Sequence, residues 1–279
     1  MAARTNLQRR AWLRASAAAL AAAALPAPAT SVAPPAPRRI ALVIGNGAYK
    51  SAPLKNPVGD AEAVAASLKQ LGYEVALRRD TGLFDLIEAL RDFSVRASKS
   101  DVRLLFYAGH GIQAKGRNYL LPVDAEPQSE DEIAAKAADV GEFIDRLSAI
   151  KQGLNIVVLD ACRVNPFAAG VIVGPDGRRL KFRGITPTGL APLDAPVGTL
   201  VAFSTAPNGV ALDGPVGAHS IYAKHLLNHL QTPALPVEQL FKRVRIGVAE
   251  ETQRVQVPWE SSSLTTEFCF KSGAQGQCG

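Results

Sequence analysis

Apolar residues follow two alternating patterns from residue 39 onward. Continuously apolar runs at residues 39–46, 102–107 and 154–160 are typical of strands buried on both faces. Shorter strands are expected at 73–77 and 199–204. Apolar positions at helical spacing predict helices at residues 60–71, 83–97, 140–150, 220–230 and 237–251. Strands that alternate with helices predict an α/β domain, with a mostly parallel sheet and helices on both faces.

The pattern is interrupted at three places. The strand at 102–107 is expected to stop at Ala108–Gly111, and residues 118–123 suggest a short hairpin or edge strand. Residues 163–197 lose all periodicity and are rich in Gly, Pro and cations, which is typical of a long functional or disordered loop. The chain from Val257 onward is also expected to be irregular.

The first 29 residues differ in composition from the rest of the chain. Arg9-Arg10 precede an Ala/Leu run at 15–25, and Ala27-Pro28-Ala29 forms a small-residue cleavage site, so the segment resembles a twin-arginine signal peptide. We therefore expect export to the periplasm, followed by a Pro-rich linker at 30–38. A disordered basic tail and a retained anchor are the alternatives, although the apolar run is short for a membrane span.

Net charge argues against a nucleic-acid partner. The chain carries a formal charge of +6, but four of its cations lie in residues 1–29, which hold no acid, so the remainder carries 6 − 4 = +2. The remainder has no cationic stripe interleaved with aromatic residues. We expect neither nucleic-acid binding nor a stable membrane span once the leader is removed.

The three cysteines differ in their settings. Cys269 and Cys278 lie close together near the C-terminus, where an oxidising compartment allows them to pair, and Cys162 is then the odd thiol. Paired C-x-x-C spacing is absent, so the sequence gives no support for a structural zinc site.

Two residues with suitable chemistry follow buried strands. His110 and Cys162 each come at the expected carboxyl end of a parallel strand, where α/β sheets carry their ligands. A thiolate is a nucleophile, and a neighbouring imidazole stabilises it and then protonates the leaving amine. The backbone N–H of Gly111 is a candidate oxyanion donor. The plainer alternatives are that Cys162 is a packed core residue and His110 a turn residue.

Five ordered motifs resemble the large-subunit region of bacterial caspase-family proteins, the metacaspases and paracaspases. They are ALVIGN (41–46) with Tyr49, LKNP (54–57) with Asp60-Ala61, FYAGHG (106–111), NYLLPVD (118–124) and LDACRVNPF (159–167). Residues 203–214 and 256–260 resemble the small-subunit region. The resemblance implies a caspase-hemoglobinase fold, a cysteine endopeptidase acting on polypeptides, and no organic cofactor. The domain would span 39–270, with a large part at 39–167, a basic linker loop at 168–197, a small part at 198–270 and a tail at 271–279.

The resemblance also assigns roles to residues. His110 matches the histidine of the family's H-G motif, and Cys162 matches the nucleophile of its D-x-C motif. Asp60, Asp160 and Asp213 fall where metacaspases and paracaspases carry the acidic S1 residues that accept Arg or Lys. The alternative is that Asp60 caps its helix and Asp160 braces the adjacent loop.

The sequence gives several candidate features of regulation and partner binding. Self-cleavage is expected after Arg178, Arg179, Lys181 or Arg183, between the large and small parts, unless these cations only form a solvated loop. Metacaspases commonly need calcium, and Asp124, Glu130, Asp131 and Glu132 offer oxygen ligands, but no metal is predicted. The oligomeric state is unknown. A noncatalytic binding module or a zymogen that needs a partner is the main rival, and a nucleotide-binding protein is a weaker one because Gly45-Asn46-Gly47 lacks the G-x-G-x-x-G pattern.

Overall fold

The computed structural model describes residues 36–162, 168–173, 179–184, 193–207, 209, 211–274 and 276–278. All the elements described below belong to one compact unit, Pro37–Gly279. The expected signal peptide at 1–29 lies outside the described residues.

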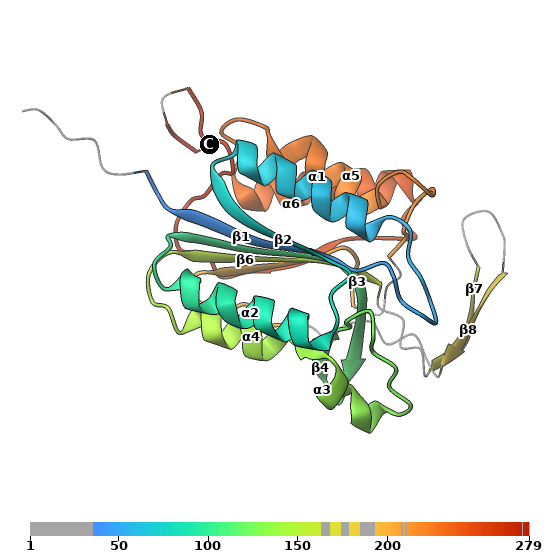
Figure 1. The fold of residues 1–279 in the computed structure, drawn as a ribbon. Coiled ribbons are helices and arrows are strands. Elements are labelled where there is room, and N and C mark those ends of the chain that lie inside the picture. The colour runs from blue at the N-terminus through green and yellow to red at the C-terminus, as the bar shows by residue number, and fades with distance from the viewer. Residues whose placement is uncertain are drawn as a thin grey trace, which may run out of the picture. The chain divides into compact units, whose positions relative to one another are not determined.

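A sheet of eight strands forms the centre of this unit (Figure 1). Its main path runs in the order β10-β9-β6-β3-β1-β2, and β4 and β5 extend it from β3. The strands are β1 (Arg39–Gly45), β2 (Tyr73–Arg79), β3 (Val102–Ala114), β4 (Arg117–Leu120), β5 (Ala138–Asp139), β6 (Leu154–Cys162), β9 (Thr199–Phe203) and β10 (Trp259–Ser262). Neighbours from β2 to β9 are parallel, whereas β10 joins β9 antiparallel at one edge.

Helices cover both faces of the sheet (Figure 1). One face carries α1 (Pro57–Gln70), α5 (Ile221–Leu230) and α6 (Val237–Glu251). The other face carries α2 (Leu83–Ala97) and α4 (Val140–Ser148). A one-turn 3-10 segment (Glu130–Glu132) and the short α3 (Ile133–Lys136) precede β5. The α/β architecture expected from the sequence is thereby confirmed.

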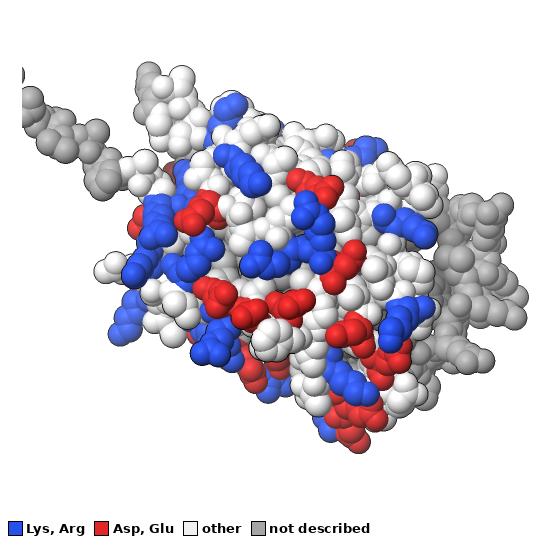
Figure 2. All heavy atoms as spheres, viewed as in Figure 1, with Lys and Arg blue, Asp and Glu red and all other residues white. Residues whose placement is uncertain are grey.

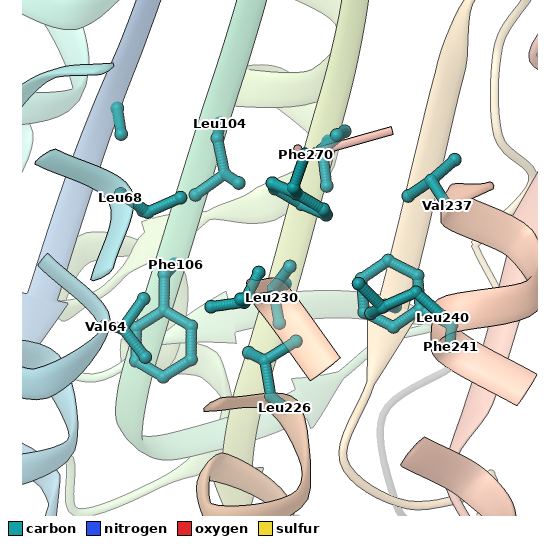
Figure 3. Close-up of a cluster of buried hydrophobic side chains, with 14 of the residues drawn as sticks. Val64, Leu68, Leu104, Phe106, Leu226, Leu230, Val237, Leu240, Phe241 and Phe270 are labelled. Carbon is teal, nitrogen blue, oxygen red and sulfur yellow. The ribbon is translucent and has the colours of Figure 1, made fainter. Parts of the chain in front are cut away.

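The continuous apolar runs supply two separate cores. Along β3, Leu104 and Phe106 pack with α1, α5 and α6, while Leu105 and Tyr107 pack with α2 and α4. Successive strand residues point to opposite faces, so a strand covered on both sides needs apolar residues at every position. Figure 3 shows the first core, in which Val64 and Leu68 of α1 approach Leu104 and Phe106, with side chains of α5, α6 and Phe270 alongside.

Most predicted helices match the structure closely, since their periodicity reports a buried face. The predicted bounds of α2 and α6 are those observed. The helix α1 begins at Pro57, three residues before the predicted start, because proline is well suited to the first helical turn.

The expectation of an irregular segment at 163–197 was wrong in part. Within it, β7 (Ala168–Val173) and β8 (Arg179–Gly184) form a two-stranded antiparallel hairpin. Hairpin pairing between backbones does not require an apolar face with helical or strand periodicity, which is why the pattern missed it. Of the proposed cleavage residues, Arg179, Lys181 and Arg183 lie in β8, and Arg178 lies outside the described residues.

The expectation that the chain is irregular from Val257 was also wrong in part. Residues Trp259–Ser262 form the edge strand β10, paired with Leu200–Phe203. Its side chains are exposed or half-buried, so the segment lacks the apolar signature of the inner strands.

Cys269 and Cys278 form a disulfide bond that links the end of the chain to a buried position. Cys269 itself forms an isolated antiparallel bridge with Pro236, just before α6. The pairing leaves Cys162 as the third cysteine, as the sequence suggested.

Charged side chains of both signs are interspersed over the face formed by α1, β2 and α2 (Figure 2). Arg79 pairs with Glu62 at 2.7 Å, and Glu74 pairs with both Arg38 and Arg96. Exposed pairs of this kind contribute roughly 0–1 kcal/mol each. Stability therefore rests mainly on the two apolar layers. In the part of the chain that the structure describes, no helix has the length and apolarity to cross a membrane.

Candidate active site

The register of two parallel strands places His110 beside Cys162. β3 and β6 pair from Val102 and Leu154 onward, and the last matched positions are His110, within β3, and Cys162, the end of β6. Neighbouring strands lie roughly 4.8 Å apart, so the two backbones come as close as adjacent strands allow. Cys162 is described by its backbone only, as the last residue of β6. The two residues singled out by the sequence are therefore brought together at one edge of the parallel sheet.

His110 lies within a strand, and the expectation that β3 stops before it was wrong. Beyond the parallel sheet, β3 continues to Ala114 by pairing with β4, from Gly111 opposite Leu120 to Ala114 opposite Arg117. Glycines on both sides of His110 suggested a turn. Gly109 instead has φ +155, and a Cβ there would lie 2.6 Å from the Tyr49 hydroxyl, so this position accepts only glycine without a shift of its neighbours.

Two tyrosine hydroxyls hold the backbone of His110. Its N–H donates to Tyr49 Oη at 2.8 Å, and its carbonyl accepts from Tyr107 Oη at 2.8 Å. The Tyr49 ring also packs on the imidazole, with centroids 4.3 Å apart. Tyr49 was noted in the sequence only as part of a motif, and neither tyrosine was identified as a site residue.

The imidazole has a defined proton arrangement. Nε2 lies 2.7 Å from the carbonyl oxygen of Ala52. A carbonyl oxygen can only accept, so Nε2 carries the proton, and in the neutral ring Nδ1 is the basic nitrogen. Burial lowers the pKa of His110 below its ordinary value, although the Ala52 carbonyl and the charge of Asp213 oppose that shift.

Gly111 has its N–H outside the β3–β4 ladder. The N–H of Leu121 donates to the carbonyl of His110, which makes Gly111 and Leu120 a non-hydrogen-bonded pair. In such a pair the N–H groups point away from the partner strand. This orientation is compatible with the predicted oxyanion donor.

Asp60, Asp160 and Asp213 line one pocket, although they are far apart in the sequence. Asp60 comes from the first turns of α1, Asp160 from β6, and Asp213 from the segment before α5. The rest of the lining is Leu54, Pro57, Ala108, Gly109, Ala211, Leu212 and Ser220. Because Gly109 precedes His110 and Asp160 is two residues before Cys162, the pocket adjoins the pair.

The helix-capping alternative for Asp60 does not describe its contacts, whereas the contact of Asp160 with Ser220 is one that a bracing residue would also make. The Asp60 carboxylate does not cap α1 but accepts from the N–H of Ser220, at 3.2 and 3.3 Å, and contacts His219 Nδ1 at 2.7 Å. Asp160 accepts from Ser220 Oγ at 2.5 Å. The N–H of Lys55 donates to Asp213 at 3.1 Å. The three carboxylates are thus held by contacts between distant segments.

The pocket places negative charge where water is scarce. The pKa of Asp160 is raised to about 7, mainly by burial and also by the charges of Asp60 and Asp213, while the hydrogen bond from Ser220 opposes the shift. Burial also raises the pKa of Asp60, against the contacts with Ser220 and His219. A cation in the pocket would relieve this unfavourable charge, so the pocket is suited to a basic side chain.

Two residues that contact the carboxylates of the pocket, Ser220 and His219, were not identified from the sequence as site residues. Ser220 was recognised only as the start of a helix, and its hydroxyl does cap α5 by accepting from the Ala223 N–H at 2.9 Å. The same hydroxyl and the backbone N–H contact the acidic residues. No sequence signal pointed to His219, because its partner Asp60 lies 159 positions away.

The oxygen ligands considered for calcium have other partners. Asp124 accepts from the N–H of Leu83 at the start of α2, and Asp131 and Glu132 pair with lysines. Glu130 accepts from the N–H of Lys115. Among the described residues, no group of three or more His, Cys, Asp or Glu side chains is arranged to hold a metal ion.

Comparisons with known proteins agree with the fold. The model of the caspase domain matches residues 38–269. Mucosa-associated lymphoid tissue lymphoma translocation protein 1 of Homo sapiens is 32% identical over 135 residues, which cover 48% of this chain and 16% of that protein. Its Mus musculus homolog is 32% identical over 131 residues, covering 47% and 15%. The matched segment is therefore a small part of these relatives.

The match to the caspase domain extends over most of the chain, from before β1 to beyond β10. Together with the mostly parallel sheet and its two helical layers, this confirms the caspase-hemoglobinase fold expected from the motifs. The chain belongs to the caspase family of cysteine peptidases.

Proposed function

We propose that this chain is a cysteine endopeptidase that uses His110 and Cys162 as a catalytic dyad and cleaves after Arg or Lys. The observation that carries the proposal is the β3–β6 register, which sets His110 opposite Cys162 beside a pocket with three carboxylates. Histidine and cysteine at paired positions of adjacent strands supply the acid, base and nucleophile that peptide hydrolysis needs.

The dyad works in two stages in this proposal. Nδ1 of His110 accepts the thiol proton, and Cys162 Sγ attacks the carbonyl carbon of the scissile bond while the Gly111 N–H stabilises the oxyanion. The imidazolium then protonates the leaving amine, the C–N bond breaks and a thioester forms. Water, deprotonated by His110, hydrolyses the thioester and restores the thiol. The Ala52 carbonyl and the two tyrosines keep the imidazole oriented through both stages.

The acidic pocket is the proposed S1 site. A basic side chain of the substrate forms charge-assisted hydrogen bonds with Asp60, Asp160 and Asp213, and an arginine can do so bidentately. An aspartate side chain would add a fourth negative charge to the same small volume. The pocket therefore favours cations over acids before the scissile bond.

Paired fluorogenic peptides that differ only in ending with Arg, Lys or Asp test the proposal on the purified chain. We expect hydrolysis after Arg and Lys and at least about 100-fold less after Asp, since a buried unpaired charge costs several kcal/mol. Each peptide is assayed with and without calcium. Equal hydrolysis of all three would contradict the basic specificity, and no hydrolysis by a folded chain would favour a zymogen awaiting activation or a noncatalytic binding module.

Self-cleavage is proposed after Arg178, Arg179, Lys181 or Arg183. Three of these cations lie in β8, whose ladder with β7 would have to open before an extended substrate segment could reach the dyad. We expect the purified chain to be cut in this segment and Cys162→Ala to stay intact. Mass spectrometry of the new ends locates the cut. An uncut chain with full activity would show that processing is not required.

We also propose that the chain is exported to the periplasm by its twin-arginine-like leader. The Cys269–Cys278 disulfide supports the proposal, because such bonds persist in oxidising compartments. Lysine replacement of both Arg9 and Arg10 should retain the chain inside the cell. Unchanged export of that variant would argue for another route.

A further inference from the structure

His219 is the half-exposed partner of a buried carboxylate in the acidic pocket. Its Nδ1 lies 2.7 Å from Asp60 Oδ1, and the side chains of His219 and Asp60 are 39% and 1% exposed. A basic side chain of the substrate that approaches Asp60 therefore reaches an oxygen that already contacts His219. The mechanism outlined above gives this imidazole no role.

The segment that carries His219 is built into the pocket wall. It begins at Asp213 and ends at Ser220, so one short segment carries an acidic pocket residue, the imidazole and the serine that contacts both Asp60 and Asp160. Near its start, Gly214 has φ +76, and a Cβ there would lie 2.5 Å from the carbonyl oxygen of His219, so the two ends of the segment lie close together. Asn56, just before α1, bonds to Pro215 and Gly217 of the same segment. The position of His219 beside Asp60 is thus fixed by several contacts.

We propose that His219 determines the specificity of the pocket by acting as a built-in competitor for Asp60, which the basic side chain of the substrate must displace. This inference rests on the proposed function of the pocket as the S1 site. A protonated His219 supplies the pocket with a cation from the protein itself, whereas a neutral His219 supplies only a hydrogen-bond donor.

The charge of the imidazole decides how strongly it competes. Histidine is the side chain that ordinarily changes charge between pH 5 and 8. His219 contacts Asp60 of α1 directly, and Asp60 shares its pocket with Asp160 of β6 and with Asp213 of the segment that carries His219. A protonated His219 satisfies part of this negative charge and repels a second cation, whereas a neutral His219 leaves the charge for the substrate.

His219→Asn tests the inference, because its amide keeps a donor near Asp60 but cannot become charged. For an Arg-ended peptide, we expect the KM of the unmodified chain to be about 10-fold higher at pH 5.5 than at pH 8. The KM of His219→Asn should be only about 3-fold higher at pH 5.5 than at pH 8. The residual 3-fold reflects protonation of the carboxylates, which both chains share. The ratio of their kcat values should not change with pH, since His219 contacts the pocket and not the dyad.

His225→Asn is the matched control. His225 also contacts a carboxylate, Glu251 at 2.8 Å, but this pair joins α5 to α6 away from the pocket. Its KM should follow that of the unmodified chain at both pH values. A His219→Asn variant whose KM changes with pH as much as that of the unmodified chain would overturn the inference and leave the proposed peptidase function intact.

Binding of agmatine, a small guanidinium cation, separates this inference from catalysis. Calorimetry on the full chain should give a Kd for agmatine that is about 10-fold higher at pH 5.5 than at pH 8. For His219→Asn, the Kd should be about 3-fold higher at pH 5.5 than at pH 8. Those changes without any peptide hydrolysis would overturn the peptidase proposal but support the inference about the pocket. Equal changes in both chains, or no binding to either, would overturn the inference.

Discussion

Replacing Cys162 with alanine is expected to lower kcat for an Arg-ended peptide by about 10⁴-fold or more, because the variant has no nucleophile to form the thioester. Cys162 ends β6 opposite His110, and the other two cysteines are joined in a disulfide, so neither can replace it. Initial rates at saturating peptide measure the loss. Circular dichroism and a mass shift for the Cys269–Cys278 bond confirm that the fold is kept.

His110→Ala is the matched variant for this prediction. Residues that act as one unit show strongly non-additive effects, so the double variant should be about as inactive as either single variant. Independent losses that multiply in the double variant would contradict a shared step. Hydrolysis that survives in Cys162→Ala would contradict the assignment of the nucleophile itself.

Asp160→Asn is expected to lower kcat/KM for Arg-ended peptides by about 100-fold while making the folded chain more stable at pH 8. The loss follows because removing one partner of a buried charge pair typically costs about 2–5 kcal/mol. The gain follows because the pKa of Asp160 is about 7 in the folded chain, against an ordinary 3.8. At pH 8 the folded chain therefore holds an unfavourable charge that asparagine lacks.

The sign of the pH effect follows from proton binding. Between pH 3.8 and about 7 the folded state binds more protons at Asp160 than the unfolded state does. Its contribution to the free energy of unfolding is thus greatest below pH 3.8 and is lost as pH rises through about 7. We expect the stabilisation of Asp160→Asn, relative to the unmodified chain, to grow by on the order of 2 kcal/mol from pH 5 to pH 8.

Urea unfolding at the two pH values and peptide kinetics provide both measurements. Glu88→Gln, which removes a charge from the exposed face of α2, is the control and should change neither activity nor the pH dependence of stability. A variant at Asp160 that loses activity and stability together at pH 8 would indicate that this carboxylate only braces the fold.

Local pattern in the sequence determined the elements and the cores. The apolar runs of β1, β3 and β6 and the periodicity of α2 and α6 each record burial of a single segment, so they can be read from neighbouring residues alone. The ordered motifs around His110 and Cys162 also identified the two residues that the β3–β6 register brings together.

Tertiary structure decided how those elements make a site. The continuation of β3 through His110 depends on its partner β4, and the β7–β8 hairpin depends on pairing that leaves little trace in apolar periodicity. The contacts of Asp60 with His219 and Ser220 join positions about 160 residues apart. Sequence spacing cannot predict such contacts, because they arise from the packing of α1 and α5 on the same face of the sheet. The sequence by itself therefore determined the fold class and the candidate dyad, whereas only the packed structure brought an imidazole and a serine to the carboxylates of the pocket.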